Sequence, residues 1–381
     1  MYAYSASGES GMKKILILSC STGEGHNSAA RAVQSILEKE GNSCILADPV
    51  AFQSEKMEKL VSALYNNTIK KRHQVFGAVY KLGDIYSSSK LPSPVYWANA
   101  HYSEALKEYI IKENFDAVLC SHLYGMEAMT ALKKRDHFII PCYGIITDYT
   151  CIPFLKETVM DGFFAPTEDT KEELIQAGIP ERSIYVTGIP VDESFTQHPT
   201  MEQARETLEI EKNKKVFLVM TGGVGCENME GLCDELQKGA GEKDLFLVLT
   251  GNNKELKSRL DEKYGSLSSF RTVPFTRQVP LYMAAANVLL SKPGGLSSTE
   301  AAVANVPIVH IHAIPGCETC NARYFSENGL SLWARSNEEA VLNAVTLAYD
   351  GEMAQSMRKK QRELIPADSA RVIANKVVGL Q

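Results

Sequence analysis

Short apolar runs alternate with amphipathic segments along most of this chain, and this alternation restricts its fold more than any other feature. The first run, KILILSC at residues 14–20, has the continuous apolar character of a strand that is buried on both faces. Residues 27–40 follow with apolar side chains at helical spacing, Gly41 ends that segment, and a second run, CILADPV, comes next. A strand, a helix and a strand in this order predict a parallel sheet with a right-handed crossover.

The alternation occurs in both halves of the chain. It weakens between about residues 50 and 100, which form an aromatic and apolar insertion, and it restarts at KVFLVMTGG after a polar segment bracketed by Pro190 and Pro199. We therefore expect an α/β protein with two Rossmann-like domains that face each other across a cleft, with ligand sites at the carboxyl ends of the strands. The expected parts are a disordered lead-in at residues 1–12, an N-terminal domain at 13–195, a C-terminal domain at 196–360 and a final helix at 361–381 that returns to the N-terminal domain.

The composition excludes several classes of protein. The chain has 381 residues and a net charge of -6, which gives no sign of nucleic-acid binding. No apolar run approaches the roughly 20 residues that a transmembrane helix needs, and the first residues lack the pattern of a secretory signal. Nine scattered cysteines are typical of reduced thiols in a cytoplasm. We expect a cytoplasmic protein that can be peripheral on the inner face of the cell membrane.

The first strand is followed by the loop CSTGEGHNSAA, which leads into a helix. Gly23 and Gly25 form part of a dinucleotide-binding pattern, with Asp48 at a suitable distance, but Ser28 stands where the third glycine belongs. His26 opens the helix at the mouth of the expected cleft, where an imidazole can act as a general base near neutral pH. The alternative is a histidine that only caps the turn.

Two loops of the second half are suited to anions. TGGVGCEN, at residues 221–228, carries three glycines directly after a strand and lacks the lysine of a Walker loop. SKPGGLSSTE, at residues 291–300, joins a strand to a helix whose first amides favour a phosphate, and Lys292 adds positive charge. The hydroxyl donors available there are Ser297, Ser298 and Thr299. Because Glu300 is suited to accept hydrogen bonds from a ribose diol, the two loops predict a nucleoside diphosphate site.

A third cluster raises the question of a metal. CETC, at residues 317–320, follows HIH at residues 310–312, and cysteine and histidine are the usual zinc ligands. No second CxxC completes a structural zinc site, and a lone CxxC outside a thioredoxin-like pattern is weak evidence for redox catalysis. A metal site therefore remains an alternative, and we expect none.

The loops resemble those of the GT-B glycosyltransferases of family 28, in the branch of monogalactosyldiacylglycerol synthase and processive diacylglycerol glucosyltransferase. SCSTGEGHNSAARAV matches the branch signature S-x-G-x-G-H-x-x-A-A, and SKPGGLSSTEA with PGCETCNA matches S-K-P-G-G-x-[ST]-x-x-E with P-G-x-E-x-x-N. The resemblance extends from about residue 14 to the end of the chain. Two positions differ: Cys317 replaces a glutamine, and TDYTCIPFL lacks the histidine and tryptophan of T-D-x-x-x-H-x-x-W.

The resemblance implies the GT-B fold, a UDP-sugar donor held mainly by the C-terminal domain and a lipid acceptor held by the N-terminal domain. It implies His26 as the base on the acceptor side, and Asp148 resembles an acidic position near the acceptor. The residues implied for the donor are Gly222, Gly223, Gly225, Gly294, Gly295 and Leu296 at the diphosphate, the backbone of Phe275 at the uracil, Glu300 at the ribose, and Glu318 and Asn321 at the sugar hydroxyls.

The expected reaction is an inverting transfer of a hexose by direct displacement. His26, or alternatively Asp148, takes the proton from an acceptor hydroxyl as that hydroxyl attacks the anomeric carbon. Loop amides, the helix N-terminus and Lys292 stabilise the leaving UDP. No DxD motif is present, so we expect no metal and no other cofactor, the UDP-sugar being a substrate.

The insertion is a candidate for contact with lipid. Its aromatic side chains are suited to shallow insertion into a bilayer or to holding acyl chains, and its basic residues to anionic headgroups. The residues concerned are Tyr65, Phe76, Tyr80, Tyr86, Tyr96 and Trp97, with Lys70, Lys71 and Arg72. The alternative is an ordinary helical subdomain with its own core.

Three other functions remain open on the sequence. They are a UDP-sugar epimerase of the same architecture, a peptidoglycan-type transferase, and a non-catalytic regulator that binds UDP-sugar. An epimerase needs no acceptor, and a regulator would bind UDP without any transfer. The donor sugar and the acceptor are not determined by these motifs.

Overall fold

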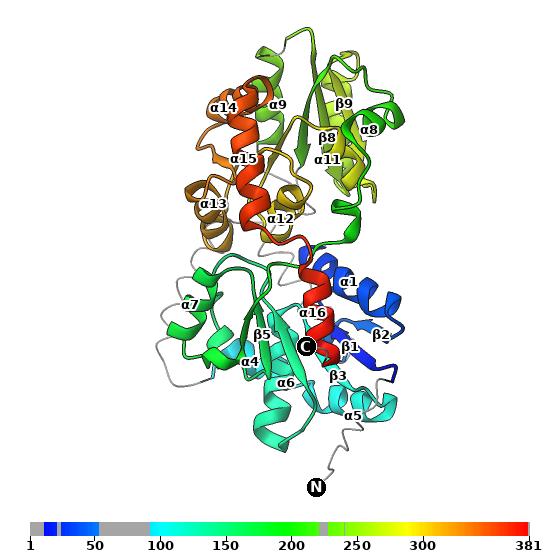
Figure 1. Ribbon diagram of the computed structural model, residues 1–381, viewed down its shortest axis with the longest axis vertical. Coiled ribbons are helices and arrows are strands. Elements are labelled where there is room, and N and C mark those ends of the chain that lie inside the picture. The colour runs from blue at the N-terminus through cyan, green and yellow to red at the C-terminus, as the bar shows by residue number, and fades with distance from the viewer. Residues whose placement is uncertain (1–10, 21–23, 53–91, 221–227, 240, 380–381) are drawn as a thin grey trace. The chain divides into compact units, whose positions relative to one another are not determined.

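The computed structural model describes residues 11–20, 24–52, 92–220, 228–239 and 241–379 (Figure 1). The chain divides into two compact units. Unit 1 consists of Met1–Asp192, Pro315–Cys317 and Ala367–Gln381, and unit 2 consists of Glu193–Ile314 and Glu318–Pro366. Within the described residues, each unit contains one six-stranded sheet whose strands all pair in parallel. This confirms the expected α/β class with two Rossmann-like parts.

The sheet of unit 1 has the strand order β2-β1-β3-β4-β5-β6. Its strands are β1 (Lys14–Leu18), β2 (Ser43–Ala47), β3 (Ala117–Cys120), β4 (Cys142–Ile145), β5 (Gly162–Ala165) and β6 (Ile184–Val186). Its helices are α1 (Glu24–Lys39), α4 (Pro94–Ala100), α5 (Ser103–Glu113), α6 (Leu123–Asp136), α7 (Glu168–Gln176) and α16 (Ser369–Val378), with short 3-10 turns η1 (Pro49–Phe52), η2 (Leu155–Glu157) and η3 (Glu181–Ser183).

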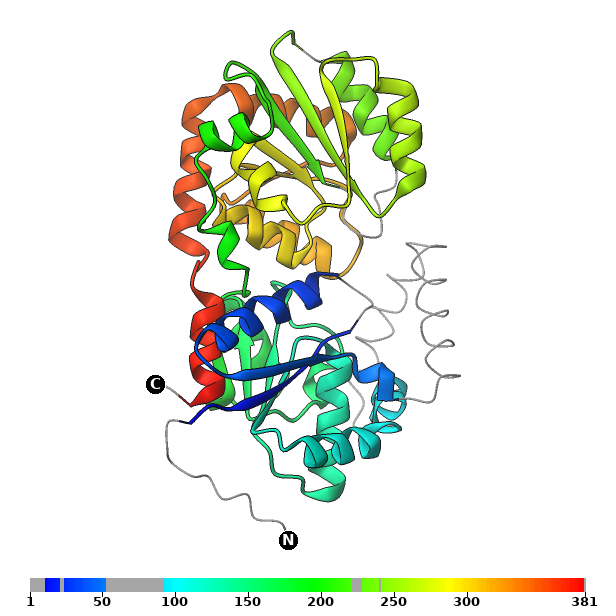
Figure 2. The ribbon, with the colours of Figure 1, turned by 90° about the vertical axis from the view of Figure 1, so that its right-hand side faces the viewer.

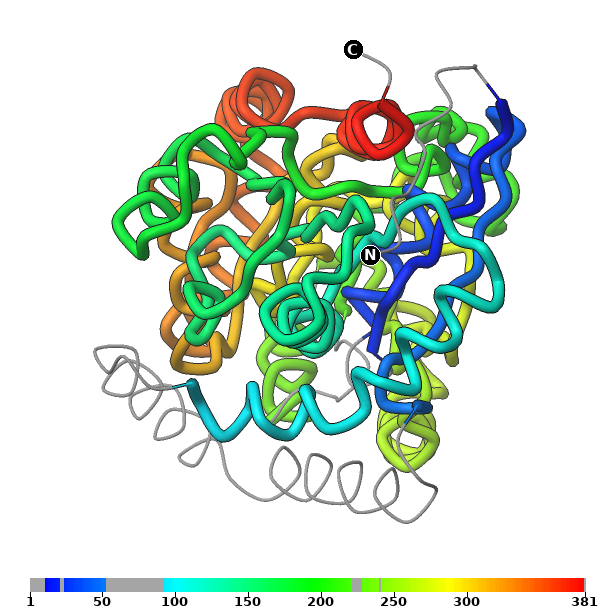
Figure 3. The backbone as a smooth tube through the Cα atoms, turned by 90° about the horizontal axis from the view of Figure 1, so that it is seen from below, coloured from blue at the N-terminus to red at the C-terminus, as the bar shows by residue number. Residues whose placement is uncertain are grey.

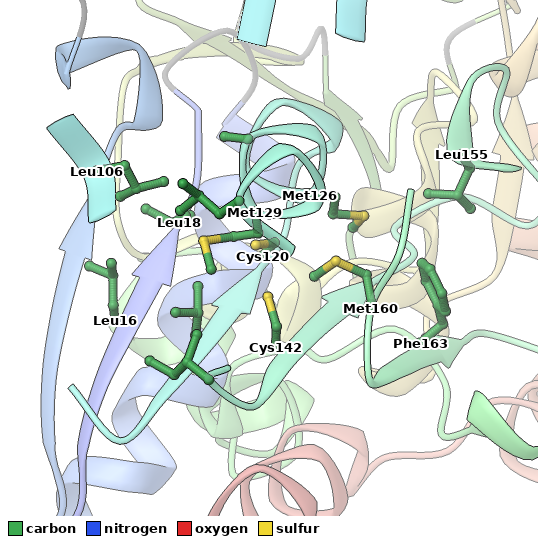
Figure 4. Packing of buried hydrophobic residues seen from close by; sticks show 14 of the residues in the cluster. Leu16, Leu18, Leu106, Cys120, Met126, Met129, Cys142, Leu155, Met160 and Phe163 are labelled. Atoms are coloured by element: carbon green, nitrogen blue, oxygen red, sulfur yellow. The ribbon is translucent and has the colours of Figure 1, made fainter. Parts of the chain in front are cut away.

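Side chains of β1 alternate between the two faces of this sheet, and each face has its own core. Ile15 and Ile17 pack against α1 and α16, which lie side by side (Figure 2). Leu16 and Leu18 belong to the core on the other face, with α5 and α6, and Figure 4 shows part of this packing. Figure 3 shows α16 end-on, on the opposite side of the sheet from α5. Burial of both faces explains the continuous apolar runs of the strands.

The sheet of unit 2 has the strand order β12-β11-β10-β7-β8-β9. Its strands are β7 (Lys215–Met220), β8 (Asp244–Gly251), β9 (Phe270–Pro274), β10 (Val288–Ser291), β11 (Ile308–His310) and β12 (Leu332–Trp333). Its helices are α8 (Met201–Thr207), α9 (Met229–Lys238), α10 (Lys254–Tyr264), α11 (Val279–Ala285), α12 (Gly295–Val303), α13 (Cys317–Glu327), α14 (Asn337–Tyr349) and α15 (Gly351–Leu364), with the 3-10 turn η4 (Glu193–Phe195).

The C-terminal segment differs from the single helix expected at residues 361–381. Residues 361–364 complete α15 in unit 2, and a separate helix, α16, packs in unit 1. Ile365 has an extended backbone (φ -109, ψ 109), and Pro366 follows it. A residue before proline is disfavoured in the helical conformation, so the break is set locally at this dipeptide. The return of the last helix to the first unit is as expected.

Among the described residues, no helix is both long enough and apolar enough to cross a membrane. Two expected aromatic contacts with lipid, Tyr96 and Trp97, lie on α4, and the other residues named for the insertion lie outside the described residues. The expectation is wrong for Tyr96, which is 8% exposed, whereas Trp97 is 63% exposed. Successive residues on a helix point about 100° apart, so Trp97 can face solvent while Tyr96 packs inward.

We predict that α16 contributes directly to the stability of unit 1. Ile373 is fully buried in the core against β1, so Ile373→Ala should lower the free energy of unfolding by about 2–5 kcal/mol. The neighbouring Val372 is 40% exposed, and Val372→Ala is the matched control, with an expected change within about 0.5 kcal/mol. Urea unfolding followed by circular dichroism measures both. Equal effects of the two substitutions would contradict the packing described.

Candidate functional site

Three adjacent strands of unit 1 deliver polar groups to one edge of the sheet. His26 lies in the first turn of α1, after β1; Ser121 follows β3, and Thr147 follows β4. His26 Nδ1 is 2.9 Å from the carbonyl oxygen of Ser121 and 2.9 Å from Thr147 Oγ1. The carboxyl ends of parallel strands share an edge, and this edge is where open α/β sheets bind ligands.

The Ser121 carbonyl determines which nitrogen of His26 carries the proton. A carbonyl oxygen only accepts hydrogen bonds, so Nδ1 of His26 donates to it and Nε2 is the unprotonated nitrogen of the neutral ring. An imidazole held in this way offers Nε2 as a proton acceptor. The His26 ring is therefore held by the segment that follows β3 and not only by its own turn, which is the orientation that the predicted general base requires.

Burial lowers the pKa of His26 from its usual value, while the negative charge of Asp148 and the hydrogen bond to Ser121 act in the opposite direction. The lowered pKa keeps the ring in its neutral, base-competent form at pH 7, and the carboxylate stabilises the imidazolium once a proton is taken up. Asp148 directly follows Thr147 and is partly buried. The structure thus places both expected catalytic residues at this edge, with Asp148 acting on His26 through its charge.

Sequence reasoning missed the residues that hold His26. Ser121 supplies the orienting carbonyl, Thr147 contributes a hydroxyl, and the His122 ring lies 4.7 Å from the His26 ring, centroid to centroid. Within the described residues, the buried Ser121 hydroxyl has no hydrogen-bond partner, so it is available to a ligand. The sequence carried one signal for these residues: Ser121 and His122 directly follow the apolar run FDAVLC, and Thr147 directly follows PCYGII.

In unit 2, the sequence predicts an anion site at the loop between β10 and α12. Gly294 is the N-cap of α12, and no side chain caps the helix. The amides of Gly295, Leu296 and Ser297 in the first turn have no acceptor within an α-helix, so they are suited to phosphate oxygens. A methyl group added at Gly294 would meet no atom within 4 Å, which leaves open space directly above the cap.

The three hydroxyls of this loop have different environments. Ser297 is partly exposed, on the same side of α12 as Gly294 and Glu300, three residues away in each direction. Ser298 and Thr299 point inward: Ser298 Oγ is 2.9 Å from His310 Nε2, and Thr299 Oγ1 donates to the carbonyl oxygen of Gly295 at 2.7 Å. Only Ser297 of the three therefore remains a candidate donor to a ligand.

His310 contacts this loop through the hydroxyl of Ser298. It is fully buried at the end of β11, and its two ring nitrogens lie 2.9 Å from Ser298 Oγ and 3.0 Å from Ser331 Oγ. Burial lowers the pKa of His310 to about 3. Both nitrogens are used in these bonds, so His310 is not arranged as a metal ligand, and within the described residues no group of three His, Cys, Asp or Glu side chains converges.

The N-terminal half of α13 contacts the same loop. Asn321 is fully buried, and its Nδ2 donates to the carbonyl oxygen of Pro293 at 3.0 Å. Glu318 accepts a hydrogen bond from the amide of Ile314 at 2.8 Å, which fixes one carboxylate oxygen. These bonds tie the helix that carries Glu318 to the segment between β10 and α12, as a shared site requires.

The other residues expected to bind the UDP-sugar lie in different segments of unit 2. Lys292 and Glu300 are partly buried at the β10–α12 loop and on α12, and Phe275 is 57% exposed directly after β9. β9 is the outermost strand of the sheet and is separated from β10 by β8 and β7. Because the sheet is parallel, its carboxyl end lies on the same side of the sheet as that of β10. Gly222, Gly223 and Gly225 lie outside the described residues.

Parallel Rossmann-like sheets in two units are the architecture of the GT-B class, and solved structures agree with this class. Acinetobacter baumannii MurG matches with a TM-score of 0.60 and 14% identity, over 96% of this chain and 99% of that chain. A UDP-GlcNAc 2-epimerase from Neisseria meningitidis, solved with UDP-GlcNAc, matches with a TM-score of 0.62 and 16% identity, over 96% of this chain and 100% of that chain. These likenesses establish the fold.

Sequence comparison gives the family. Residues 26–191 match the model described as monogalactosyldiacylglycerol (MGDG) synthase, and residues 157–377 match the model described as UDP-N-acetylglucosamine 2-epimerase. A processive diacylglycerol beta-glucosyltransferase of Bacillus licheniformis is 24% identical over 370 residues, 96% of this chain and 94% of the relative, and one of Staphylococcus aureus is 27% identical over 352 residues, 91% and 87%. The chain belongs to the GT-B glycosyltransferase family of MGDG synthase and the processive diacylglycerol glucosyltransferases, and its second half belongs to the sequence family described by the epimerase model.

We predict that unit 2 loses stability on acidification through His310. Its pKa is about 3 in the folded protein and about 6.5 in an unfolded chain, so the unfolded state binds more protons between these values. Stability is therefore complete above pH 6.5 and falls as the pH drops toward 3. His310→Gln, which cannot be protonated, should show a smaller loss between pH 8 and pH 5 in urea unfolding. The exposed His101→Gln is the control, and an unchanged pH dependence in His310→Gln would contradict this account.

A second prediction isolates the open space above the α12 cap. Gly294 has φ -70 and free room for a methyl group, so Gly294→Ala should fold with a stability cost of about 1 kcal/mol or less, the loss of a glycine cap. A phosphate close to the backbone would clash with that methyl at a cost of about 1–3 kcal/mol, so the Kd for UDP should rise about 5- to 150-fold. Gly351→Ala, also with open space, is the matched control. Calorimetric titration with UDP measures all three proteins, and equal affinities would rule out a phosphate at Gly294.

Proposed function

We propose that this protein is a UDP-sugar-dependent glycosyltransferase that moves a hexose, with inversion, to a hydroxyl group of a lipid such as diacylglycerol. The observation that carries the proposal is the oriented His26, with Nε2 available as a base, in a chain similar over nearly its whole length to processive diacylglycerol beta-glucosyltransferases. A general base for an alcohol is what sugar transfer to a lipid hydroxyl requires.

Unit 1 supplies the activation of the acceptor. Nε2 of His26 takes the proton from the attacking hydroxyl, while Nδ1 keeps its bond to the Ser121 carbonyl throughout. The imidazolium that forms is stabilised by Asp148, which acts on His26 electrostatically. The proton thus moves to a ring whose position does not change during the step, which lowers the cost of reorganisation.

Unit 2 supplies the departure of the nucleotide. The amides at the start of α12 and the positive end of its dipole stabilise the negative charge that develops on the β-phosphate. Lys292 adds a cation, Glu300 accepts from the ribose, and Glu318 contacts the sugar. Asn321 is fully buried, so it holds the segment before α12 through its bond to the Pro293 carbonyl and, contrary to expectation, does not reach a sugar hydroxyl. A metal ion is not required in this scheme, because backbone amides and lysine carry the charge.

The stereochemistry follows from the direct displacement. UDP-hexose donors are α-linked at the anomeric carbon, and a β-linked product requires one inversion at that carbon. A single attack by the acceptor oxygen, opposite the leaving UDP, produces this outcome without a covalent sugar–enzyme intermediate. The relatives named above are described as beta-glucosyltransferases, which supports the same course here.

We further infer a peripheral position on the inner face of the cell membrane. The acceptor is a membrane lipid, and Trp97, on α4 within the aromatic and basic insertion, is 63% exposed. An indole is suited to the membrane interface. The partners are then a UDP-hexose, a lipid acceptor and an anionic membrane surface, with no role for nucleic acid.

A second candidate function is epimerisation of a UDP-sugar. The match of residues 157–377 to the epimerase family model favours it, because that region includes the whole donor site. An epimerase acts on the sugar nucleotide alone, so it consumes UDP-GlcNAc without lipid. The match to the MGDG synthase model in residues 26–191, where the acceptor would bind, favours the transferase.

We predict that purified protein with UDP-hexoses and diacylglycerol in vesicles produces a glycolipid detectable by mass spectrometry. His26→Ala should lower kcat by about 10²–10⁴-fold, the usual contribution of a general base, and leave the Kd for UDP nearly unchanged. The exposed His101→Ala is the control and should retain full activity. Conversion of a UDP-sugar without lipid would favour the epimerase, and UDP binding without any product would favour a regulator.

A further inference from the structure

His122 stands directly against the proposed base. It follows β3, next to the Ser121 that orients His26, and its ring meets the His26 ring edge to face, at a centroid distance of 4.7 Å and an interplanar angle of 89°. On its other side, the Tyr124 ring lies 4.5 Å away at 79°. His122 is therefore held between the base and an aromatic side chain.

The proton of His122 is also assigned by its contacts. Nδ1 of His122 accepts a hydrogen bond from the amide of Tyr124 at 3.2 Å, as the N-cap of α6. An N–H only donates, so Nδ1 is unprotonated and Nε2 carries the hydrogen, the reverse of the arrangement in His26. The two rings thus have opposite tautomers, each determined by a backbone group that cannot change its role.

The backbone around His122 is held by a buried polar chain. Tyr102 Oη donates to Asn99 Oδ1 at 2.7 Å and lies 3.3 Å from the carbonyl oxygen of Tyr124. Asn99 in turn donates to the buried Glu127 at 2.6 Å. Both Tyr102 and Glu127 are almost fully buried, so the strand end that carries His122 has little freedom.

We propose that His122 is a positioning residue for the reaction: its ring packs against His26 and keeps Nε2 of His26 aimed at the acceptor hydroxyl. This inference rests on the proposed function and adds a residue to it. His122 does not exchange a proton with the substrate in this scheme. It acts through the orientation of His26, while its hydrogen bond to Tyr124 separately caps α6.

The charge states of His26 and His122 support these separate roles. Burial and the neighbouring His26 both hold the pKa of His122 well below its usual range, so this ring stays neutral. Asp148 is the acidic group that acts on His26, and it favours a proton there rather than on His122. Two imidazolium rings at this separation would repel each other, so a permanently neutral neighbour lets His26 carry the proton during transfer.

Two substitutions separate the packing of His122 from its capping. Asparagine is a good N-cap but has no ring, so His122→Asn keeps the start of α6 and removes the contact with His26. Phenylalanine keeps a ring but cannot accept the amide hydrogen bond, so His122→Phe preserves the packing and removes the cap. The proposal and a purely structural role of His122 therefore predict opposite rankings of activity.

We expect His122→Asn to lower kcat by about 10²-fold, the loss typical of a catalytic group misplaced by about 1 Å, with the KM for the UDP-sugar unchanged. The acid limb of the pH profile of kcat/KM should move to higher pH, because water then reaches His26 and relieves the burial that lowers its pKa. His122→Phe should keep kcat within about threefold and lose about 2–4 °C in melting temperature. Activity that follows melting temperature in both variants would overturn the proposal.

A readout that needs no turnover keeps this test separate from that of the function. Long-range 1H–15N spectra of the histidine side chains, with His26 assigned through a His26→Gln variant, report the tautomer and titration of His26. A well-defined Nδ1–H form in the wild type and in His122→Phe, and an averaged ring in His122→Asn, would support the positioning role even if no acceptor is glycosylated. An unchanged His26 signal in His122→Asn would exclude it, whatever the protein catalyses.

Discussion

The need to cover both faces of two parallel sheets governs this structure. Helices must return the chain between parallel strands, so every strand of a unit ends at the same edge. In unit 1 this edge collects His26, Ser121 and Thr147 from three adjacent strands, and in unit 2 it collects the start of α12. Residues far apart in sequence meet there because the strands that precede them are adjacent and parallel and are held by the cores on both faces of the sheet.

Each site is prepared by backbone groups more than by charged side chains. A carbonyl oxygen selects the tautomer of His26, and the first amides of α12 have no side-chain cap. These groups cannot change their hydrogen-bonding roles, so the sites keep their polarity without a ligand. A buried neutral histidine lies beside each of these groups. His122 packs against the His26 ring, and His310 holds the Ser298 hydroxyl at the start of α12.

The sequence predicted the clearly periodic elements well: β1 lies within KILILSC, α1 covers nearly all of the expected residues 27–40, and β7 lies within KVFLVMTGG. It missed β6 and β12, because strands of two or three residues at a sheet edge carry too little periodicity. For the site, the glycines of the loops and His26 could be identified from the sequence, because the expected chemistry needs these residue types at these positions. The partners Ser121 and Thr147 were not, because a backbone carbonyl has no residue-specific signal and the direction of a hydroxyl, as in Ser298, depends on the packing around it.

The place of α16 has a consequence for how the protein is made. Ala370, Ile373, Ala374 and Val377 complete one core of unit 1, yet the ribosome adds them after all of unit 2. Unit 2 can therefore fold before α16 is made, whereas the core of unit 1 beside α1 lacks these side chains until then. During synthesis, the core of unit 1 thus becomes complete only after unit 2 has been made.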